Sequence, residues 1–214
     1  MNKSKRVIFI MLISLVIINI GIAAVAANKK SLPQQLGEAQ KNMNTDNAIV
    51  VATFREKPIY LSAIDRRAIA DEIVNDSDRE LNNREILEKV LINEILVVEA
   101  ENLGLSVTQD EIISDLDLTK RNYYDYPEVA RFVDNYCASR EIGIDEYWDI
   151  VEKSISSMIL RAKMQKEYYS MYTGKEKNDI NMTFEEIMKI EEAYKAYCQE
   201  LLAKYDKDIV YYDN

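Results

Sequence analysis

The sequence predicts a mainly α-helical fold, a multi-helix bundle with a small β element, and three observations lead to this fold class. Only 5 of the 214 residues are glycine and 3 are proline, too few for the tight turns of an all-β protein. Several long segments repeat apolar residues at helical spacing. Two short β-prone runs, near the start and the end of the predicted domain, are expected to pair because a lone strand leaves backbone groups unsatisfied.

The composition restricts the function. The formal net charge is −10 and no basic face is evident, so we expect no nucleic acid among the partners. The chain has no histidine, which removes Ser/His and Cys/His nucleophile pairs and the usual zinc and haem ligands. We therefore expect a protein that is not an enzyme and that holds no metal or other cofactor.

Residues 1–27 are predicted to be a signal peptide or a membrane anchor. Three basic residues near the start precede an uncharged apolar run from Val7 to Ala27, which is about 31 Å long as a helix, enough to span a bilayer. The length favours an uncleaved anchor, whereas the small residues Ala24 and Ala26 fit cleavage after Ala26. Either way we expect the rest of the chain outside the cytoplasm, anchored to the cell membrane by this one helix or secreted.

Residues 28–48 are predicted to be a flexible tether. The segment is polar, rich in Asn and Gln, and shows no sustained periodicity. A flexible chain of this length has an r.m.s. reach of roughly 25 Å.

The folded part is predicted to span residues 49–214. Ile49–Phe54 and the pair Ile59-Tyr60 are β-branched or aromatic runs typical of short strands. Ser62 is expected to be the N-cap of a helix over residues 63–74.

The central helix is expected at residues 86–103. Eleven of these eighteen residues are apolar and lie almost all round a helix, so the helix should be buried. Gly104 supplies the left-handed residue that ends helices. Thr108 and Glu111 form a T-x-x-E capping box that starts the next helix.

The rest of the chain predicts four helices and a final β-prone run, residues 209–212. A proline break, glycine stops and a second capping box at Thr183 and Glu186 set the helix limits. The expected helices end near residues 124, 140, 172 and 205. One packing stripe on the longest of them is predicted to contain Trp148, Val151, Ile155, Met158 and Ala162.

Two sets of residues in this order resemble a known family. The first is Val51-Ala52-Thr53-Phe54, Ile59, Ser62 and Ile64; the second is Leu91, Ile92, Leu96, Ala100, Gly104, Leu105, Val107, Thr108 and Glu111. They are similar to the opening strand and the central helix of the N-terminal chaperone domain of SurA-type proteins, shared in outline with PrsA-type foldases and the trigger-factor chaperone domain. The resemblance covers residues 49 to 212. Arg55-Glu56 replaces the Asn-Gly turn of that family.

The resemblance implies a helical domain whose first and last strands pair. It also implies non-catalytic binding of unfolded or extended polypeptides outside the cytoplasm. The parvulin-type prolyl isomerase domain of the related foldases carries paired histidines, and this chain has no room for it and no histidine. We therefore expect no isomerase activity.

Six side chains on the last two long helices are candidates for a peptide-binding surface. Flexible thioethers beside tyrosine rings suit a surface that accepts varied apolar peptides. Ordinary core packing explains the same pattern, and the sequence leaves both interpretations open. The candidates are Met158, Met164, Tyr168, Tyr172, Tyr194 and Tyr197.

The two cysteines, Cys137 and Cys198, are far apart in the sequence. Outside the cytoplasm a disulfide between them is one interpretation, and two buried thiols are the other.

The leading functional hypothesis is an extracytoplasmic chaperone-like holdase that binds unfolded or nascent exported polypeptides, tethered to the membrane through residues 7–27. The alternative is a membrane-anchored structural adaptor that docks one folded partner protein. An adaptor needs one fixed patch, whereas a holdase needs a broad surface of methionine and tyrosine.

Overall fold

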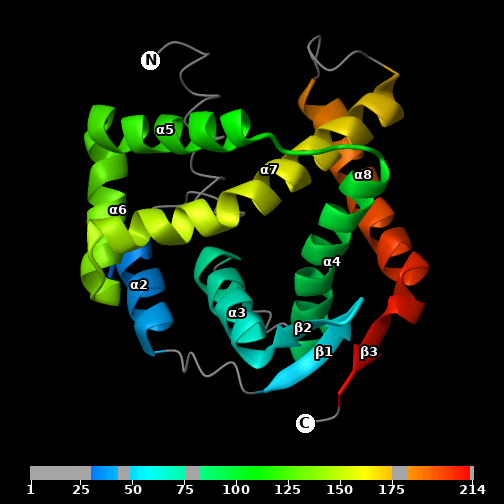
Figure 1. Ribbon diagram of the computed structural model, residues 1–214, viewed down its shortest axis with the longest axis horizontal. Coiled ribbons are helices and arrows are strands. Elements are labelled where there is room, and N and C mark those ends of the chain that lie inside the picture. Colours follow the sequence, from blue (N-terminus) through cyan, green and yellow to red (C-terminus); the bar gives the residue numbers. More distant parts are fainter. Residues whose placement is uncertain (1–29, 43–48, 76–81, 175–182, 213–214) are drawn as a thin grey trace. The chain divides into compact units, whose positions relative to one another are not determined.

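The computed structural model describes residues 30–42, 49–75, 82–174 and 183–212. Within these residues the chain forms seven α-helices, one short 3-10 helix and a three-stranded antiparallel sheet (Figure 1). The predicted fold class, mainly helical with a small β element, is confirmed for this part of the chain. The predicted signal or anchor segment, residues 1–27, lies outside the described residues.

The described residues group into two compact units. The first unit contains those within 1–45, 65–82 and 109–155, and the second contains those within 46–64, 83–108 and 156–214. The sequence predicts one domain over residues 49–214, and the described residues of that range fall into both units. Two helices, α3 (Leu61–Asn75) and α7 (Ile144–Thr173), contribute residues to both units, and helical periodicity does not reveal such a division.

The sheet belongs to the second unit and has the strand order β2-β1-β3. Its strands are β1 (Val50–Phe54), β2 (Lys57–Tyr60) and β3 (Ile209–Tyr211). Strand β3 pairs with β1 in antiparallel register, with Phe54 opposite Ile209 and Ala52 opposite Tyr211. The predicted pairing of the first and last β-prone runs is therefore confirmed.

The turn between β1 and β2 keeps hairpin geometry without the Asn-Gly pair. Arg55 and Glu56 both have positive φ, 47° and 67°, as a two-residue type I′ turn requires. Each of these non-glycine residues costs roughly 1 kcal/mol or more in the left-handed region. Arg55 offsets this cost because its backbone N–H donates to the carbonyl of Asp208 at 3.0 Å, and its Nε donates to the Asp208 carboxylate at 3.0 Å.

Helix α4 (Asn83–Asn102) is the predicted central helix and packs on α8 (Phe184–Lys204) within the second unit. Leu91, Ile95 and Ala100 have no exposed surface. Gly104 follows with φ of 75° and ends the helix as expected. The other apolar side chains of α4 are buried or half-buried, so the expected burial is confirmed, and Leu103, just beyond the helix end, is exposed.

Helix α2 (Leu32–Asn42) lies within the segment predicted to be a flexible tether, so that prediction was wrong for these residues. It packs on α6 (Pro127–Arg140) in the first unit. Gly37 allows this close approach: a Cβ there would lie 2.5 Å from the carbonyl oxygen of Tyr136. The backbone N–H of Ser31 donates to Oε1 of Gln34 at 2.9 Å, half of an S-x-x-Q capping box that the sequence analysis overlooked.

The core of the first unit brings together α6, the start of α7 and α5 (Gln109–Asp125). Its buried members are Val133, Cys137, Tyr147 and Trp148, with half-buried apolar side chains around them. The rings of Tyr147 and Trp148 meet edge to face with centroids 4.9 Å apart, and Tyr123 approaches Trp148 at 5.7 Å. Trp148 is thus a core anchor.

Two local predictions need correction. Ser62 is not an N-cap, because α3 begins at Leu61 directly after β2 and Ser62 is buried within the helix. The stripe predicted along α7 is buried or half-buried from Trp148 to Met158, but its last member, Ala162, is exposed whereas Leu160 is buried. The stripe changes because residues up to 155 belong to the first unit and later ones to the second, so each half buries a different face.

The other helix limits agree with expectation to within a few residues. Helix α8 starts with the predicted capping box, in which Thr183 accepts from the Glu186 backbone and the Glu186 side chain reaches back to Thr183. Helix α7 ends before Gly174, which has φ of 63°. Among the helices of the described residues, none combines the length and the apolar character needed to cross a membrane.

Candidate functional site

Five tyrosines of α7 and α8 form a cluster within the second unit, and we call them the tyrosine cluster. Its members are Tyr168, Tyr169, Tyr172, Tyr194 and Tyr197. Tyr168 is at the centre: its ring stacks on Tyr197 with centroids 4.7 Å apart and on Tyr172 at 6.0 Å. Offset and tilted pairs at these separations each stabilise by about 0.5–1.5 kcal/mol beyond area burial.

Helical spacing explains why these rings meet. Tyr168 and Tyr172 are four residues apart on α7, and Tyr194 and Tyr197 are three apart on α8, so each pair lies on one helix face. The ring centroids of Tyr168 and Tyr194 are 5.2 Å apart across the two helices. The cluster therefore holds the second half of α7 against α8.

Exposed apolar side chains lie next to the cluster in the sequence of both helices. Tyr172 is 53% exposed and Met171 is 56% exposed near the end of α7, and Ile187 and Met188 are exposed in the first turns of α8. Single exposed apolar residues are common, but these four lie in the last turn of α7 and the first turns of α8, the two helices that the cluster joins. The cluster thus has a half-buried centre and an accessible rim.

The structure brings together four of the six predicted binding residues: Tyr168, Tyr172, Tyr194 and Tyr197. Met164 has no exposed surface and packs in the core. Met158 is half-buried and lies ten residues before Tyr168, which is about 15 Å along a helix. Tyr169, which the sequence analysis left out of the site, is a fifth member.

Burial raises the pKa of four hydroxyls in the cluster and keeps them protonated: those of Tyr168, Tyr169, Tyr194 and Tyr197. Burial raises the pKa of Tyr197 to about 12, and the negative charge of Glu99 adds to this effect. Burial and a hydrogen bond to Glu191 raise the pKa of Tyr169 above its ordinary value. Nε2 of Gln165 donates to the Tyr169 hydroxyl at 3.1 Å. The rings therefore offer uncharged aromatic surfaces, with one hydroxyl held in place by a carboxylate.

The two cysteines are free and buried, Cys137 in the first unit and Cys198 in the second. Burial raises the pKa of Cys198 to about 11, with a hydrogen bond from Tyr194 acting in the opposite direction. Burial also raises the pKa of Cys137. Both thiols are therefore held mainly in the protonated form, which is the weaker nucleophile.

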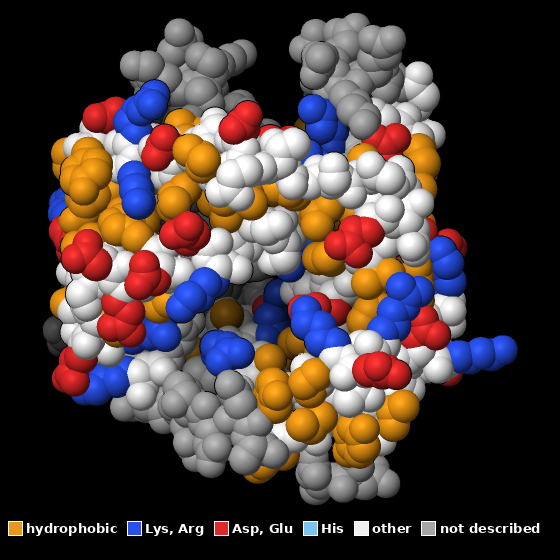
Figure 2. Space-filling model, viewed as in Figure 1, with side chains coloured by type: hydrophobic (Ala, Val, Ile, Leu, Met, Phe, Trp, Pro, Cys, Tyr) orange, Lys and Arg blue, Asp and Glu red, His pale blue; other side chains and the backbone are white. Residues whose placement is uncertain are grey.

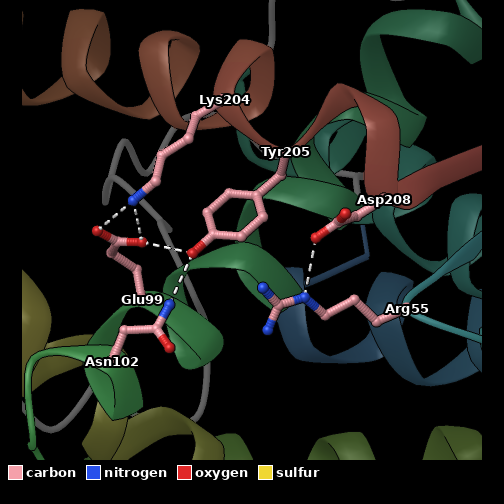
Figure 3. Close-up of polar contacts among 6 residues, drawn as sticks. All are labelled: Arg55, Glu99, Asn102, Lys204, Tyr205 and Asp208. Carbon is pink, nitrogen blue, oxygen red and sulfur yellow. Dashed lines mark hydrogen bonds and ion pairs between the residues drawn. The ribbon is translucent and has the colours of Figure 1, made fainter.

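A polar network anchors the far end of α8 against α4 (Figure 3). The carboxylate of Glu99 is buried; it accepts hydrogen bonds from Lys204 Nζ to both oxygens at 2.9 Å and from the Tyr205 hydroxyl at 2.7 Å. Nδ2 of Asn102 donates to the same hydroxyl at 2.8 Å. The Arg55 guanidinium lies 5.1 Å from the Tyr205 ring centroid, beside its ion pair with Asp208. A buried charge needs partners of this kind, and here each oxygen has one.

Sequence reasoning overlooked this network, although a signal was present. Leu91 and Ile95 lie on the buried face of α4, and a further step of four residues reaches Glu99. A carboxylate on the core face of a helix predicts a buried partner. Lys204 and Tyr205 are more than 100 residues away, so their identity as partners depends on the tertiary fold.

The described residues contain no group of three or more histidine, cysteine or acidic side chains arranged to hold a metal ion. In comparisons with protein-family models, with curated proteins and with solved structures, none matches this chain. The resemblance to the SurA-type chaperone domain therefore stays a prediction from its residues.

Proposed function

We propose that this protein is an extracytoplasmic holdase that binds unfolded or extended polypeptides, without isomerase or other enzymatic activity. The observation that carries the proposal is the tyrosine cluster with its exposed rim. Aromatic rings and a thioether give contact area to apolar side chains of varied shape, and neutral hydroxyls supply hydrogen bonds at the edge. The resemblance to SurA-type domains supports the same function.

The apolar run at residues 7–27 supports a location at the membrane for this activity. A single membrane helix would keep the folded units close to polypeptides that emerge from the membrane. The protein would then act on nascent exported chains, at a high local concentration set by its attachment.

The test is suppression of aggregation by the full chain, measured by light scattering with several unrelated denatured proteins at stoichiometric ratio. We expect a delay for each of them. The variant Tyr172→Ser with Met188→Ser should lose much of the effect, because both side chains are exposed and are not needed for the core. Tyr124→Ser is the matched control: it removes a 74% exposed tyrosine of the first unit and should retain activity. If the wild-type protein delays none of the aggregation reactions, the holdase proposal is wrong.

A structural adaptor is the second candidate, and one observation favours it. The cluster rings contact one another, and the Tyr169 hydroxyl is held by Glu191, so the patch is more fixed than a plastic methionine surface. An adaptor would bind one folded protein tightly and would ignore unrelated denatured clients. The breadth of the aggregation assay therefore separates the two functions.

A further inference from the structure

The two outer edges of the sheet differ in their capacity to accept another strand. Strand β1 is central and is paired on both sides, so only β2 and β3 have an outer edge. An unprotected edge presents backbone donors and acceptors to any extended chain, and proteins commonly block such edges with proline or lysine.

The edge of β2 carries both of these blocking residues. Lys57 lies opposite Phe54, directly after the two-residue turn, so this pair exchanges hydrogen bonds with β1. The next residue, Pro58, must then point its backbone nitrogen away from β1, and proline has no N–H to donate. An added strand would meet a missing donor in the middle of β2.

The edge of β3 has no such block. The hydrogen bonds from Arg55 to Asp208 and from Tyr212 to Val51 show that residues 208, 210 and 212 face β1. The N–H and C=O of Tyr211 and the C=O of Ile209 therefore point outward. The Ile209 N–H is already bonded to the carbonyl of Asp206, and no described backbone group pairs with the other three.

Apolar side chains accompany this open edge. Val210 is 52% exposed and Tyr212 is 46% exposed, on and just after β3. Figure 2 shows hydrophobic side chains gathered over the part of the second unit where Figure 1 places β1 and β3. A strand laid along β3 would gain hydrogen bonds from Tyr211 and apolar contact with Val210, the two contributions that act in β-strand addition.

Charge and interface size distinguish two possible occupants of the β3 edge, a second copy of this chain and an extended segment of another polypeptide. A second copy of this chain would bring together two molecules that each carry a net charge of −10. A three-residue edge strand also falls far short of the roughly 1,000 Å² that a stable dimer interface buries. A single extended segment needs no such area when another part of the same polypeptide is bound elsewhere on the protein. Positive charge on that segment would complement the net charge of −10 of this chain.

We propose that the outer edge of β3 accepts a short extended segment of a bound polypeptide, one with alternating apolar residues and net positive charge. This inference rests on the proposed holdase function and adds a second contact within the same unit. The tyrosine cluster would hold apolar side chains, while the Tyr211 backbone would pair with the client main chain. Main-chain pairing is largely independent of side-chain identity, as broad client selection requires.

The test uses the full chain and a fluorescent ten-residue peptide of alternating valine and threonine with lysines at both ends, followed by fluorescence anisotropy. Tyr211→Pro removes the outward N–H while Val210 still pairs with β1, and it should weaken binding about tenfold, the effect expected for loss of one or two hydrogen bonds. Tyr211→Phe keeps the backbone and is the matched control. A peptide N-methylated at three central residues keeps its side chains but loses three backbone donors. We expect the wild-type protein to bind it no more tightly than Tyr211→Pro binds the unmodified peptide.

Equal binding of the N-methylated and unmodified peptides would overturn the inference, even if Tyr211→Pro fails to fold. Absence of peptide binding would also overturn it. A concentration-dependent dimer in sedimentation that Tyr211→Pro abolishes would overturn it as well, because a second copy of the chain would then occupy the edge. These failures are distinct from failure of the holdase function. If Tyr211→Pro delays aggregation as well as wild type while Tyr172→Ser with Met188→Ser does not, the holdase function stands and the edge has no part in it.

Discussion

The hydroxyl of Tyr205 donates a hydrogen bond of 2.7 Å to the buried carboxylate of Glu99, 106 residues earlier in the chain. The same hydroxyl accepts from Asn102 at 2.8 Å, so both of its hydrogen-bonding roles are used. The Tyr205 ring meets Phe54 of β1 edge to face with centroids 5.8 Å apart. One residue thus connects α4, the end of α8 and the sheet.

Removal of this hydroxyl should destabilise the second unit. We expect Tyr205→Phe to lower the free energy of unfolding by about 1–3 kcal/mol, because the Glu99 carboxylate loses a buried donor. Urea denaturation followed by circular dichroism measures the change. Tyr212→Phe, at an exposed position, is the control and should change the free energy of unfolding by less than about 0.5 kcal/mol.

Acid should weaken the same network. Burial alone raises the pKa of Glu99, but hydrogen bonds from Tyr205 and Lys204 outweigh it and lower the pKa below the ordinary value of 4.5. A lowered pKa in the folded state means that this stabilisation is complete above pH 4.5 and is lost as the pH falls through the folded value. We expect Glu99→Gln to be less stable at pH 7 and to show a shallower loss of stability in acid. Parallel pH curves for variant and wild type would show that Glu99 contributes nothing to the acid transition.

Tyr197 of the tyrosine cluster should titrate late. Because the pKa of Tyr197 is raised to about 12, stability should fall between pH 10, the ordinary tyrosine value, and pH 12, as the unfolded state loses protons first. Absorbance near 295 nm should show a group of tyrosines that ionises late, above pH 10. Tyr197→Phe should remove one tyrosine from the late group, and a single transition for all fourteen tyrosines would contradict the cluster.

Helix α2 should depend on the glycine at its contact with α6. A Cβ at position 37 would lie 2.5 Å from the Tyr136 carbonyl oxygen and 2.8 Å from Ser139 Cβ, so Gly37→Ala should cost about 1–3 kcal/mol or detach the helix. Hydrogen exchange of residues 32–42 reports this directly. Gly143→Ala is the matched control, since no atom lies within 4 Å of its added Cβ. Unchanged protection in Gly37→Ala would mean that α2 does not pack closely on α6.

The hairpin turn offers a stabilising substitution. Glu56 has φ of 67°, a conformation that glycine adopts without a Cβ penalty, so Glu56→Gly should raise the free energy of unfolding by roughly 0.5–1 kcal/mol. Glu56→Ala keeps the Cβ and should give no comparable gain. Thermal unfolding of the three proteins in parallel decides this, and equal midpoints would show that the turn stores no strain.

Local patterns in the sequence were enough to find most elements. The stop at Gly104 and the capping box at Thr183 depend on neighbours within a few residues, and both are where they were predicted. The pairing of β1 with β3 was predicted because two lone β-prone runs each need a partner. The four clustered tyrosines were found because methionine and tyrosine gather on the last two helices, the composition of an adaptable apolar surface.

Most of the wrong or missing predictions concern features that depend on residues distant in the sequence. Helix α2 is polar enough to resemble a tether; its local signal, the S-x-x-Q box at Ser31, was overlooked, and its packing partner Tyr136 is distant in the sequence. Met164 could not be separated from the accessible tyrosines, because burial depends on what packs over a side chain. The division of α7 between two units likewise follows from tertiary contacts. The partner Tyr205 of Glu99 lies 106 residues away.

By itself, the sequence determined the helical class, most of the helix limits and the need for the two β-prone runs to pair, because caps, glycine stops and apolar periodicity act over a few residues. Only the tertiary structure decided which rings meet in the tyrosine cluster, which carboxylate is buried at Glu99, and which sheet edge stays open at Tyr211. Those features depend on long-range packing, in which one residue is surrounded by others that no local pattern identifies.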